Sequence, residues 1–225
     1  MNVLSASLTI LRKDLRIELR TGEVVVTTSM FALLVAVLTS LSFYVDSRSA
    51  TMVAPGVLWI AVTFSGVLAM GRSWGRERDN DAIRALMAAP VPRAAIYLGK
   101  AGATLLFLAV VEALLVLAVA VLFNLALLEV LLPLSLLLLM GTVGFVAAGT
   151  LFAAMGVRTG ARDMVLAVAL FPIVAPALLC GVVATRELLG GAPFSEIIDW
   201  LTILAAFDIA FLTAGTLLFE PLMQD

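Results

Sequence analysis

Long uncharged stretches alternate with short polar intervals along this chain. Four runs without a charged residue cover 22, 23, 28 and 22 residues, at 24–45, 49–71, 130–157 and 164–185. Each is longer than the roughly 20 apolar residues that a helix needs to cross the hydrocarbon of a bilayer. With two further apolar stretches that each contain one carboxylate, the pattern predicts six transmembrane helices, at about 24–45, 53–71, 98–122, 130–153, 163–184 and 201–219.

The overall composition agrees with this pattern. The 225 residues are 63% hydrophobic and 13% charged, whereas soluble proteins average about 45–50% apolar and about 25% charged residues. We therefore expect an all-α, polytopic membrane protein in which residues 1–225 form a single transmembrane domain.

The segment 3–20, ahead of the first span, is amphipathic. Leucines recur at helical spacing along one side of it, at Leu4, Leu8, Leu11, Leu15 and Leu19. The other side is charged and holds Arg12, Lys13, Asp14, Arg16, Glu18 and Arg20. This pattern predicts a helix that lies in the membrane interface with its basic side chains toward anionic head groups. A solvated helix docked on a partner is the alternative.

The distribution of basic residues predicts the orientation of the spans. Four Lys and Arg residues lie in the N-terminal segment, six in 72–100 and two in the next loop on that side, Arg158 and Arg162. The opposite side holds only Arg48 and Arg186. Because cytoplasmic loops are enriched in Lys and Arg, this 12-to-2 division predicts that both termini are cytoplasmic.

The only long polar interval, 72–97, has the pattern of a short structured element. Its charges alternate in sign at Arg76, Glu77, Arg78, Asp79 and Asp81, so acidic residues crowd the start of a predicted helix, as the helix dipole favours. One apolar face follows, made by Ile83, Leu86 and Met87, and Pro90 ends the helix. We expect this helix to dock on a soluble partner and to receive mechanical work from it. A solvated charged connection is the alternative.

Several kinds of chemistry are absent from the sequence. There is no histidine, and Cys180 is the single cysteine. No phosphate-binding loop is present, because the nearest fragment, Gly99-Lys100-Ala101, lacks both the earlier glycine and the hydroxyl residue of that motif. We therefore expect neither an enzyme nor an ATP-binding subunit.

Two carboxylates, Glu112 and Asp208, fall at mid-membrane depth in the third and sixth predicted spans. An acidic residue there costs about 2.5 to 3.5 kcal/mol on insertion scales, so each should face protein or water and not lipid. One interpretation is a polar site on a conducting path. The other is a buried, hydrogen-bonded group that fixes helix packing.

Several short segments of the sequence are distinctive. The most specific are Arg76-Glu77-Arg78 together with Ala89-Pro90-Val91. The others are Pro55-Gly56 through Trp59, Gly71-Arg72-Ser73, Ile96 to Lys100, the charged residues of the N-terminal segment, Asp208, and Phe219-Glu220-Pro221-Leu222. Together these segments resemble the haem exporter protein B family, CcmB, and the resemblance extends over essentially the whole chain.

This resemblance implies the permease subunit of an ABC complex for cytochrome c maturation in the bacterial inner membrane. The implied fold is type-2 ABC exporter-like, with an interfacial elbow helix at 3–20 and a coupling helix in 72–97. The residues expected to meet the ATPase are Arg76, Glu77, Arg78, Ile83, Leu86, Met87 and Pro90. The implied partners are a CcmA-like ATPase, a haem-handling CcmC-like protein, a small CcmD-like helper and the periplasmic haem chaperone, CcmE-like, with two copies of the chain per complex.

The resemblance leaves open whether the chain moves haem itself or transmits ATP-driven motion that frees the loaded chaperone. Durable haem ligation normally uses histidine, cysteine, methionine or tyrosine, and the absence of histidine favours the motor role, with no cofactor held durably and ATP bound only by the partner. Two other functions remain alternatives: a permease for a lipid, glycan or drug, and an ATP-independent carrier that uses Glu112 and Asp208.

Overall fold

The computed structural model describes residues 2–43, 47–79, 82–127, 129–159 and 166–224, and within them it contains helices and no strand. The helices are α1 (Val3–Thr21), α2 (Glu23–Ser42), α3 (Ser47–Asp79), α4 (Ala82–Ala88), α5 (Arg93–Leu122), α6 (Leu131–Thr159), the π-helical segment η1 (Leu166–Leu170), α8 (Phe171–Leu189) and α9 (Phe194–Gln224).

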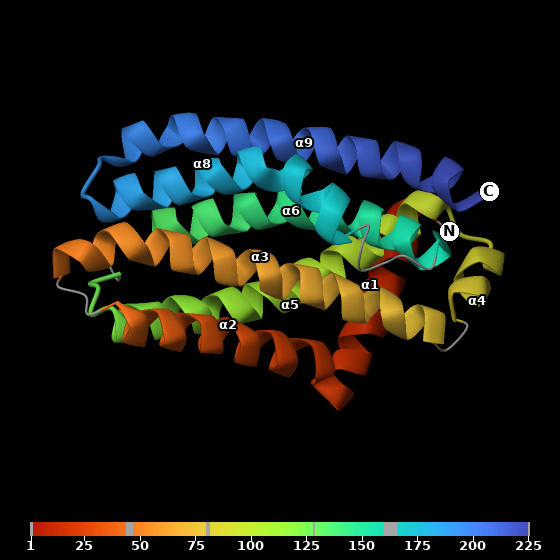
Figure 1. Ribbon diagram of the computed structural model, residues 1–225. Helices are drawn as coiled ribbons and strands as arrows, with labels where there is room; N and C mark the ends of the chain where they lie inside the picture. Colours follow the sequence, from red (N-terminus) through yellow and green to blue (C-terminus); the bar gives the residue numbers. More distant parts are fainter. Residues whose placement is uncertain (1, 44–46, 80–81, 128, 160–165, 225) are drawn as a thin grey trace.

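Six of these helices form an elongated bundle. The helices α2, α3, α5, α6, α8 and α9 are long and apolar enough to cross a membrane, and they run side by side (Figure 1). Both termini and α4 lie at one end of the bundle, called the terminal end here, while the α5–α6 and α8–α9 connections lie at the far end. The prediction of an all-α polytopic membrane protein with six spans is therefore confirmed.

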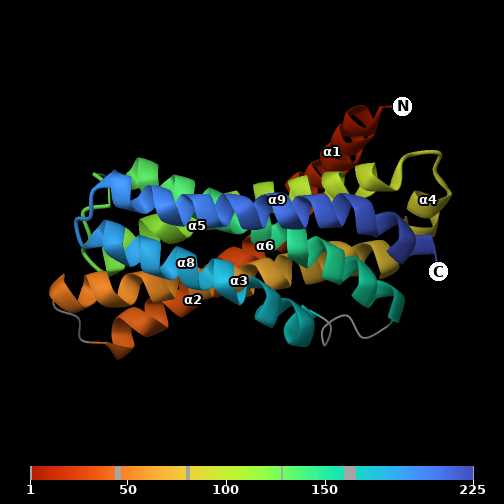
Figure 2. The same cartoon turned by 90° about the horizontal axis from the view of Figure 1, so that it is seen from above.

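The helix α1 does not follow the bundle axis. It projects obliquely from the terminal end (Figure 2) and turns into α2 at Gly22, whose φ of 61° is left-handed. Glycine adopts this conformation at no steric cost, since it has no Cβ. The backbone N–H of Gly22 also donates to the carbonyl of Glu18 at 2.7 Å, which closes the last turn of α1.

Several helices extend beyond the spans that the sequence predicts, and two of these extensions bear on the site. The helix α3 continues to Asp79, and α5 begins at Arg93. Residues 72–79 therefore belong to the last turns of a long helix and not to a loop. The reason is packing, because Trp74 and Tyr97 in these extensions are almost fully buried.

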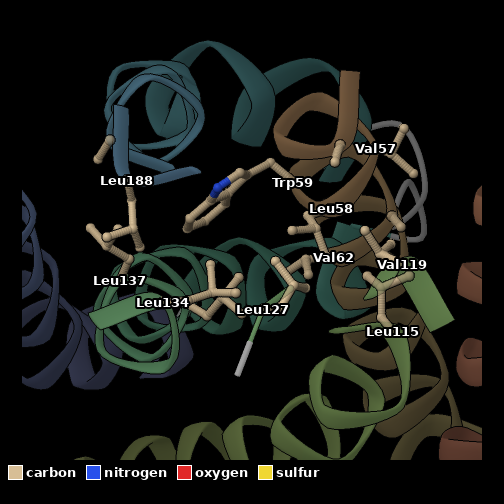
Figure 3. Packing of buried hydrophobic residues seen from close by; sticks show 14 of the residues in the cluster. Val57, Leu58, Trp59, Val62, Leu115, Val119, Leu127, Leu134, Leu137 and Leu188 are labelled. Carbon is tan, nitrogen blue, oxygen red and sulfur yellow. The ribbon is translucent and has the colours of Figure 1, made fainter. Parts of the chain in front are cut away.

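The buried core at the far end is organised around Trp59 of α3 (Figure 3). Its indole lies against the backbone of α6 at Gly141 and of α8 at Gly181, where an added Cβ would overlap the ring. The indole Nε1–H donates to Thr185 Oγ1 at 2.9 Å. Glycine at these two positions thus lets α6 and α8 approach the bulky Trp59 of α3, as is typical of membrane helix packing.

A second core cluster lies toward the terminal end. Its aromatic centre is Phe219 of α9, whose ring centroid lies 6.2 Å from that of Trp74 and 5.8 Å from that of Tyr97. The Tyr97 hydroxyl donates to the carbonyl of Ala147 at 3.0 Å. This cluster joins α3, α5, α6 and α9 directly beneath the charged residues described next.

Candidate functional site

The charged side chains of the terminal end are organised by the way α1 packs on α5. The buried stripe of α1 consists of Ala6, Ile10, Asp14 and Glu18 at four-residue intervals. The apolar half of this stripe approaches α5 closely, because Ile10 lies against Gly99, where an added Cβ would come within 2.8 Å of it. The same register turns two carboxylates of α1 into the protein, which differs from the expected interfacial helix with one uniformly exposed charged side.

Four charged side chains from three helices meet at this packing surface, and together they are called the ion cluster. Lys100 of α5 is 1% exposed, Glu77 of α3 is 4% exposed and Asp14 of α1 is 5% exposed. The Lys100 Nζ lies 2.5 Å from Glu77 Oε1 and 2.9 Å from Asp14 Oδ2. Lys13 Nζ, which is half-buried, lies 2.5 Å from Glu77 Oε1 and 3.1 Å from Asp14 Oδ1.

The ion cluster balances two cations against two anions. A single buried charge without a partner would cost several kcal/mol, so each member depends on the others. Burial disfavours the ammonium form of Lys13, but the carboxylates of Asp14 and Glu77 outweigh this effect and raise the pKa of Lys13. Lys100 also lies 5.7 Å above the ring of Trp74, in cation–π geometry.

A second group of charges connects α1 and α2 to α3. Arg76 lies 3.5 Å from Glu18 Oε2 and 3.1 Å from Glu23 Oε2, and Arg72 lies 3.2 Å from Glu23 Oε1. Glu18 also accepts the backbone N–H of Val25 at 2.8 Å. Because Glu23 is exposed, its pairs with Arg72 and Arg76 should be worth about 1 kcal/mol or less each. The Arg76–Glu18 pair is more buried.

A short helix is present within the predicted segment 72–97. The helix α4 covers Ala82–Ala88 and ends before Pro90, which is exposed. Leu86 is half-buried and packs against the core cluster of the terminal end. The side chains of Ile83 and Met87 lie outside the described residues, so their apolar face stays a prediction.

The structure separates the three predicted charged residues that precede α4. Glu77 joins the buried ion cluster, Arg76 joins the second group of charges, and Arg78 is exposed. Lys13, Asp14 and Lys100 were not predicted as members of one site. The Lys13–Glu77 and Lys100–Glu77 contacts join residues that are 64 and 23 positions apart in the sequence. Helical periodicity identifies only residues that share a face of one helix, so it could not predict these contacts.

The two intramembrane carboxylates both contact α6. Glu112 is buried and accepts a hydrogen bond from Thr142 Oγ1. Asp208 is buried against the backbone of Gly144, where an added Cβ would collide with the carboxylate. Among the described residues, neither carboxylate has a cationic partner within ion-pair distance.

Glu112 also borders a cavity of about 620 Å³ near the far end. The cavity lies between α5 and α6 and is bounded by Phe194 at the start of α9. Its walls are almost entirely apolar, and Glu112 and Ser135 supply the polar side chains. The two carboxylates therefore differ, since Glu112 faces a cavity and Asp208 is held in helix packing.

Comparison with known proteins gives a consistent family assignment. The family model described as "CcmB protein" matches residues 5–221. Heme exporter protein B of Bradyrhizobium diazoefficiens (strain JCM 10833 / BCRC 13528 / IAM 13628 / NBRC 14792 / USDA 110) is 27% identical over 222 residues, which cover 96% of this chain and 94% of the relative. Heme exporter protein B of Escherichia coli (strain K12) is 30% identical over 91 residues, and the match spans 40% of this chain and only 41% of the length of that relative. Since the family model covers nearly the whole sequence, the chain belongs to the CcmB protein family.

Proposed function

We propose that the chain is the membrane permease subunit of an ABC complex for cytochrome c biogenesis. In this role it couples ATP hydrolysis by a separate CcmA-like subunit to haem export or to release of a haem-loaded periplasmic chaperone. The family assignment and the printed names of the relatives support this proposal. The six apolar helices are consistent with it.

One observation carries the coupling part of the proposal, namely the position of the ion cluster. Glu77 lies on the last turns of α3 and Lys100 on the early turns of α5, so the cluster joins the two helices that flank α4. Asp14 attaches α1 to the same point. A force applied to α4 would therefore reach three helices through one rigid junction.

The partner ATPase is proposed to dock at the terminal end. The 12-to-2 division of basic residues favours a cytoplasmic location for this end, where ATP is available. In the proposed interface Ile83, Met87 and the exposed part of Leu86 on α4 enter a cleft of the ATPase, flanked by Arg76 and Arg78 and closed by Pro90. Glu77, predicted to flank the cleft, is buried in the ion cluster and supports the interface from behind. CcmC-like, CcmD-like and CcmE-like partners and two copies of the chain complete the complex.

Haem enters the proposal as cargo or as the ligand of the chaperone. The chain offers no histidine for axial ligation, and histidine is the commonest haem ligand of proteins that hold haem. We therefore favour the role of a motor that frees the loaded chaperone over that of a durable haem carrier.

The experiment that tests this function targets α4. Leu86→Asp or Met87→Asp should detach the ATPase more strongly than Asp79→Ala, because truncating or charging a buried interface residue often costs a few kcal/mol and an exposed ion pair about 1 kcal/mol or less. Membrane insertion should stay normal in all three variants. Haem-loaded chaperone should accumulate while haem attachment to the chaperone continues.

Two results would contradict the proposal. If haem no longer reaches the chaperone in the Leu86→Asp variant, the chain acts before loading and not in release. If the intact chain never co-purifies with an ATPase subunit, the ABC assignment itself fails.

The cavity beside Glu112 favours one second candidate. Its apolar walls and its volume of about 620 Å³ suit an acyl chain or another apolar group, as expected for a permease of lipid-like cargo. Loss of c-type cytochromes on deletion of the chain, with an unchanged lipid composition, would exclude this candidate.

A further inference from the structure

The cavity beside Glu112 is a deep space that begins at the far end of the bundle. It is bounded there by Phe194, and α6 lines it from Leu131 to Leu139. Glu112 lies about 15 Å below Leu122, the last residue of α5, because a helix rises about 1.5 Å per residue. The volume of about 620 Å³ falls in the range of about 300–1,000 Å³ that is typical of pockets for small molecules.

The polar side chains that face this cavity are hydrogen-bond acceptors. Glu112 is 8% exposed, and its carboxylate accepts a hydrogen bond from the Thr142 hydroxyl. The hydroxyl of Ser135 donates to the carbonyl of Leu132 at 2.8 Å, so its oxygen is left as an acceptor. Among the described residues that line the cavity, none is a lysine or an arginine. The cavity therefore has a negative group at depth and no described side chain that neutralises it.

A carboxylate in such an apolar cavity needs a partner. Apolar surroundings strongly disfavour a negative charge that is neither hydrated nor paired, and one hydrogen bond from Thr142 does not saturate the acceptor capacity of a carboxylate. A bound molecule with a positive charge supplies the missing partner. The rest of that molecule has to be apolar, because the other walls consist of Leu, Val, Ala, Pro and Phe side chains.

Two other occupants match the cavity less well. An acyl chain would contact the apolar walls but leave Glu112 without a cation. One turn of a helix with its side chains occupies roughly 500 Å³, from a diameter of about 11 Å and a pitch of about 5.4 Å. The cavity thus holds little more than one helical turn, so a membrane helix of a neighbouring protein would not enter it.

We propose that the cavity is a binding site for lipophilic cations. One molecule binds per chain, with its apolar body between α5 and α6 and its positive charge at the Glu112 carboxylate. The same carboxylate disfavours molecules that carry carboxylates of their own, such as fatty acids and haem. This site is additional to the proposed coupling role, and its test requires neither haem nor an ATPase.

The test uses the full-length chain in uncharged detergent. Tetraphenylphosphonium is the cationic probe, and tetraphenylborate, an anion of the same shape, is the matched probe. Equilibrium dialysis of each probe, corrected for its binding to empty micelles, gives the affinity and the number of molecules bound per chain. We expect about one tetraphenylphosphonium per chain and at least about tenfold weaker binding of tetraphenylborate, because charges interact strongly in a site of low polarity.

A substitution on α5 tests the charge. Glu112→Gln keeps the size of the side chain and the acceptor for Thr142, and it should weaken the binding of tetraphenylphosphonium at least about tenfold, because it removes the partner of a buried cation. The control is Glu129→Gln, which makes the same change in net charge at an exposed residue that does not line the cavity. It should leave the affinity unchanged.

A second substitution on α5 tests the space. Ala113→Phe fills part of the cavity and keeps the carboxylate, so it should also weaken the binding of tetraphenylphosphonium. Its control is Val110→Phe, which enlarges a side chain that is 48% exposed on the same helix and does not line the cavity. Thermal unfolding without a probe verifies that each variant is folded.

Four outcomes would overturn the proposal. No saturable binding of tetraphenylphosphonium by the unmodified chain would leave the cavity to acyl chains of the bilayer. Equal or tighter binding of tetraphenylborate would assign it to an anionic ligand. The other two are an unchanged affinity in folded Glu112→Gln and an equal loss of affinity in either control variant.

Discussion

Lys100 of α5 and Asp14 of α1 form an ion pair of 2.9 Å in which neither side chain is more than 6% exposed. The pair fixes the oblique helix α1 to a bundle helix at the point where Glu77 of α3 also arrives. Three helices that meet at one buried charge cannot move independently without separating opposite charges in an environment of low polarity. This relationship makes the terminal end a mechanical unit and leads to the first prediction.

Lys100→Met should destabilise the protein by about 3–5 kcal/mol, because it leaves two buried carboxylates with Lys13 as their remaining partner in the ion cluster. Thermal unfolding of the purified chain in detergent measures this change. The matched control is Arg186→Met, which removes an exposed cation from α8 and should cost about 1 kcal/mol or less.

A charge exchange refines this prediction. The double variant Glu77→Lys with Lys100→Glu keeps two cations and two anions in the ion cluster, so it should recover part of the stability that either single change loses. Such recovery would show that these two side chains interact directly. An unfolding temperature for Lys100→Met equal to that of the unmodified chain would show that the ion cluster does not form.

Packing around Trp59 gives the second prediction. An added methyl group at Gly181 would overlap the indole, so Gly181→Ala should destabilise the protein by about 1–3 kcal/mol, the typical cost of overpacking a core. Gly56→Ala is the matched control, because no atom lies within 4 Å of its added Cβ. It should be neutral or stabilising by up to about 1 kcal/mol, as alanine is the better helix former.

Thermal unfolding of the two alanine variants distinguishes packing from helix propensity. We expect a lower unfolding temperature for Gly181→Ala and an unchanged or higher one for Gly56→Ala. Equal shifts of the same sign would mean that Trp59 does not occupy the gap between α3, α6 and α8.

The six spans could be predicted from the sequence because they depend on local composition. A run without charge, such as 24–45, identifies a membrane helix without any knowledge of its neighbours. The end of α3 could not be located in this way. Arg72, Arg76 and Glu77 are typical of a solvated loop by composition, and the helix continues through them because their partners come from α1, α2 and α5.

The same limit applies to the candidate site. The amphipathic pattern of 3–20 predicts a helix, and α1 is present over Val3–Thr21. Which charges face inward depends on the angle at which α1 crosses α5, and that angle is set by the close approach of Ile10 to Gly99. A single sequence contains both residues but not their contact.

The third prediction concerns topology. Reporters fused after Asp225 and within the α4 segment should be cytoplasmic, and reporters at 46–50 and 186–196 should lie outside, because 12 of the 14 basic residues fall on the first side. Both termini and α4 share the terminal end in the structure (Figure 1), so their reporters must agree with one another whichever side is cytoplasmic. An external signal from the C-terminus with a cytoplasmic signal from α4 would be incompatible with this arrangement.

The fourth prediction separates the two interpretations of the intramembrane carboxylates. Asp208→Asn should preserve maturation of c-type cytochromes, because the side chain lies in helix packing against Gly144 and an amide of equal size can remain there. Glu112→Gln should also preserve it, since the amide can still accept the hydrogen bond of Thr142. Cytochrome c content per amount of membrane-inserted chain is the measurement.

A control at Glu112 removes the hydrogen-bonding group as well as the charge. Glu112→Leu should lower the amount of folded chain, because Thr142 then lacks its partner and the wall of the cavity changes. Loss of maturation in Glu112→Gln at a normal protein level would contradict the packing interpretation. It would instead make the cavity beside Glu112 part of the working mechanism, because Gln has nearly the same size and keeps the acceptor for Thr142 but cannot ionise.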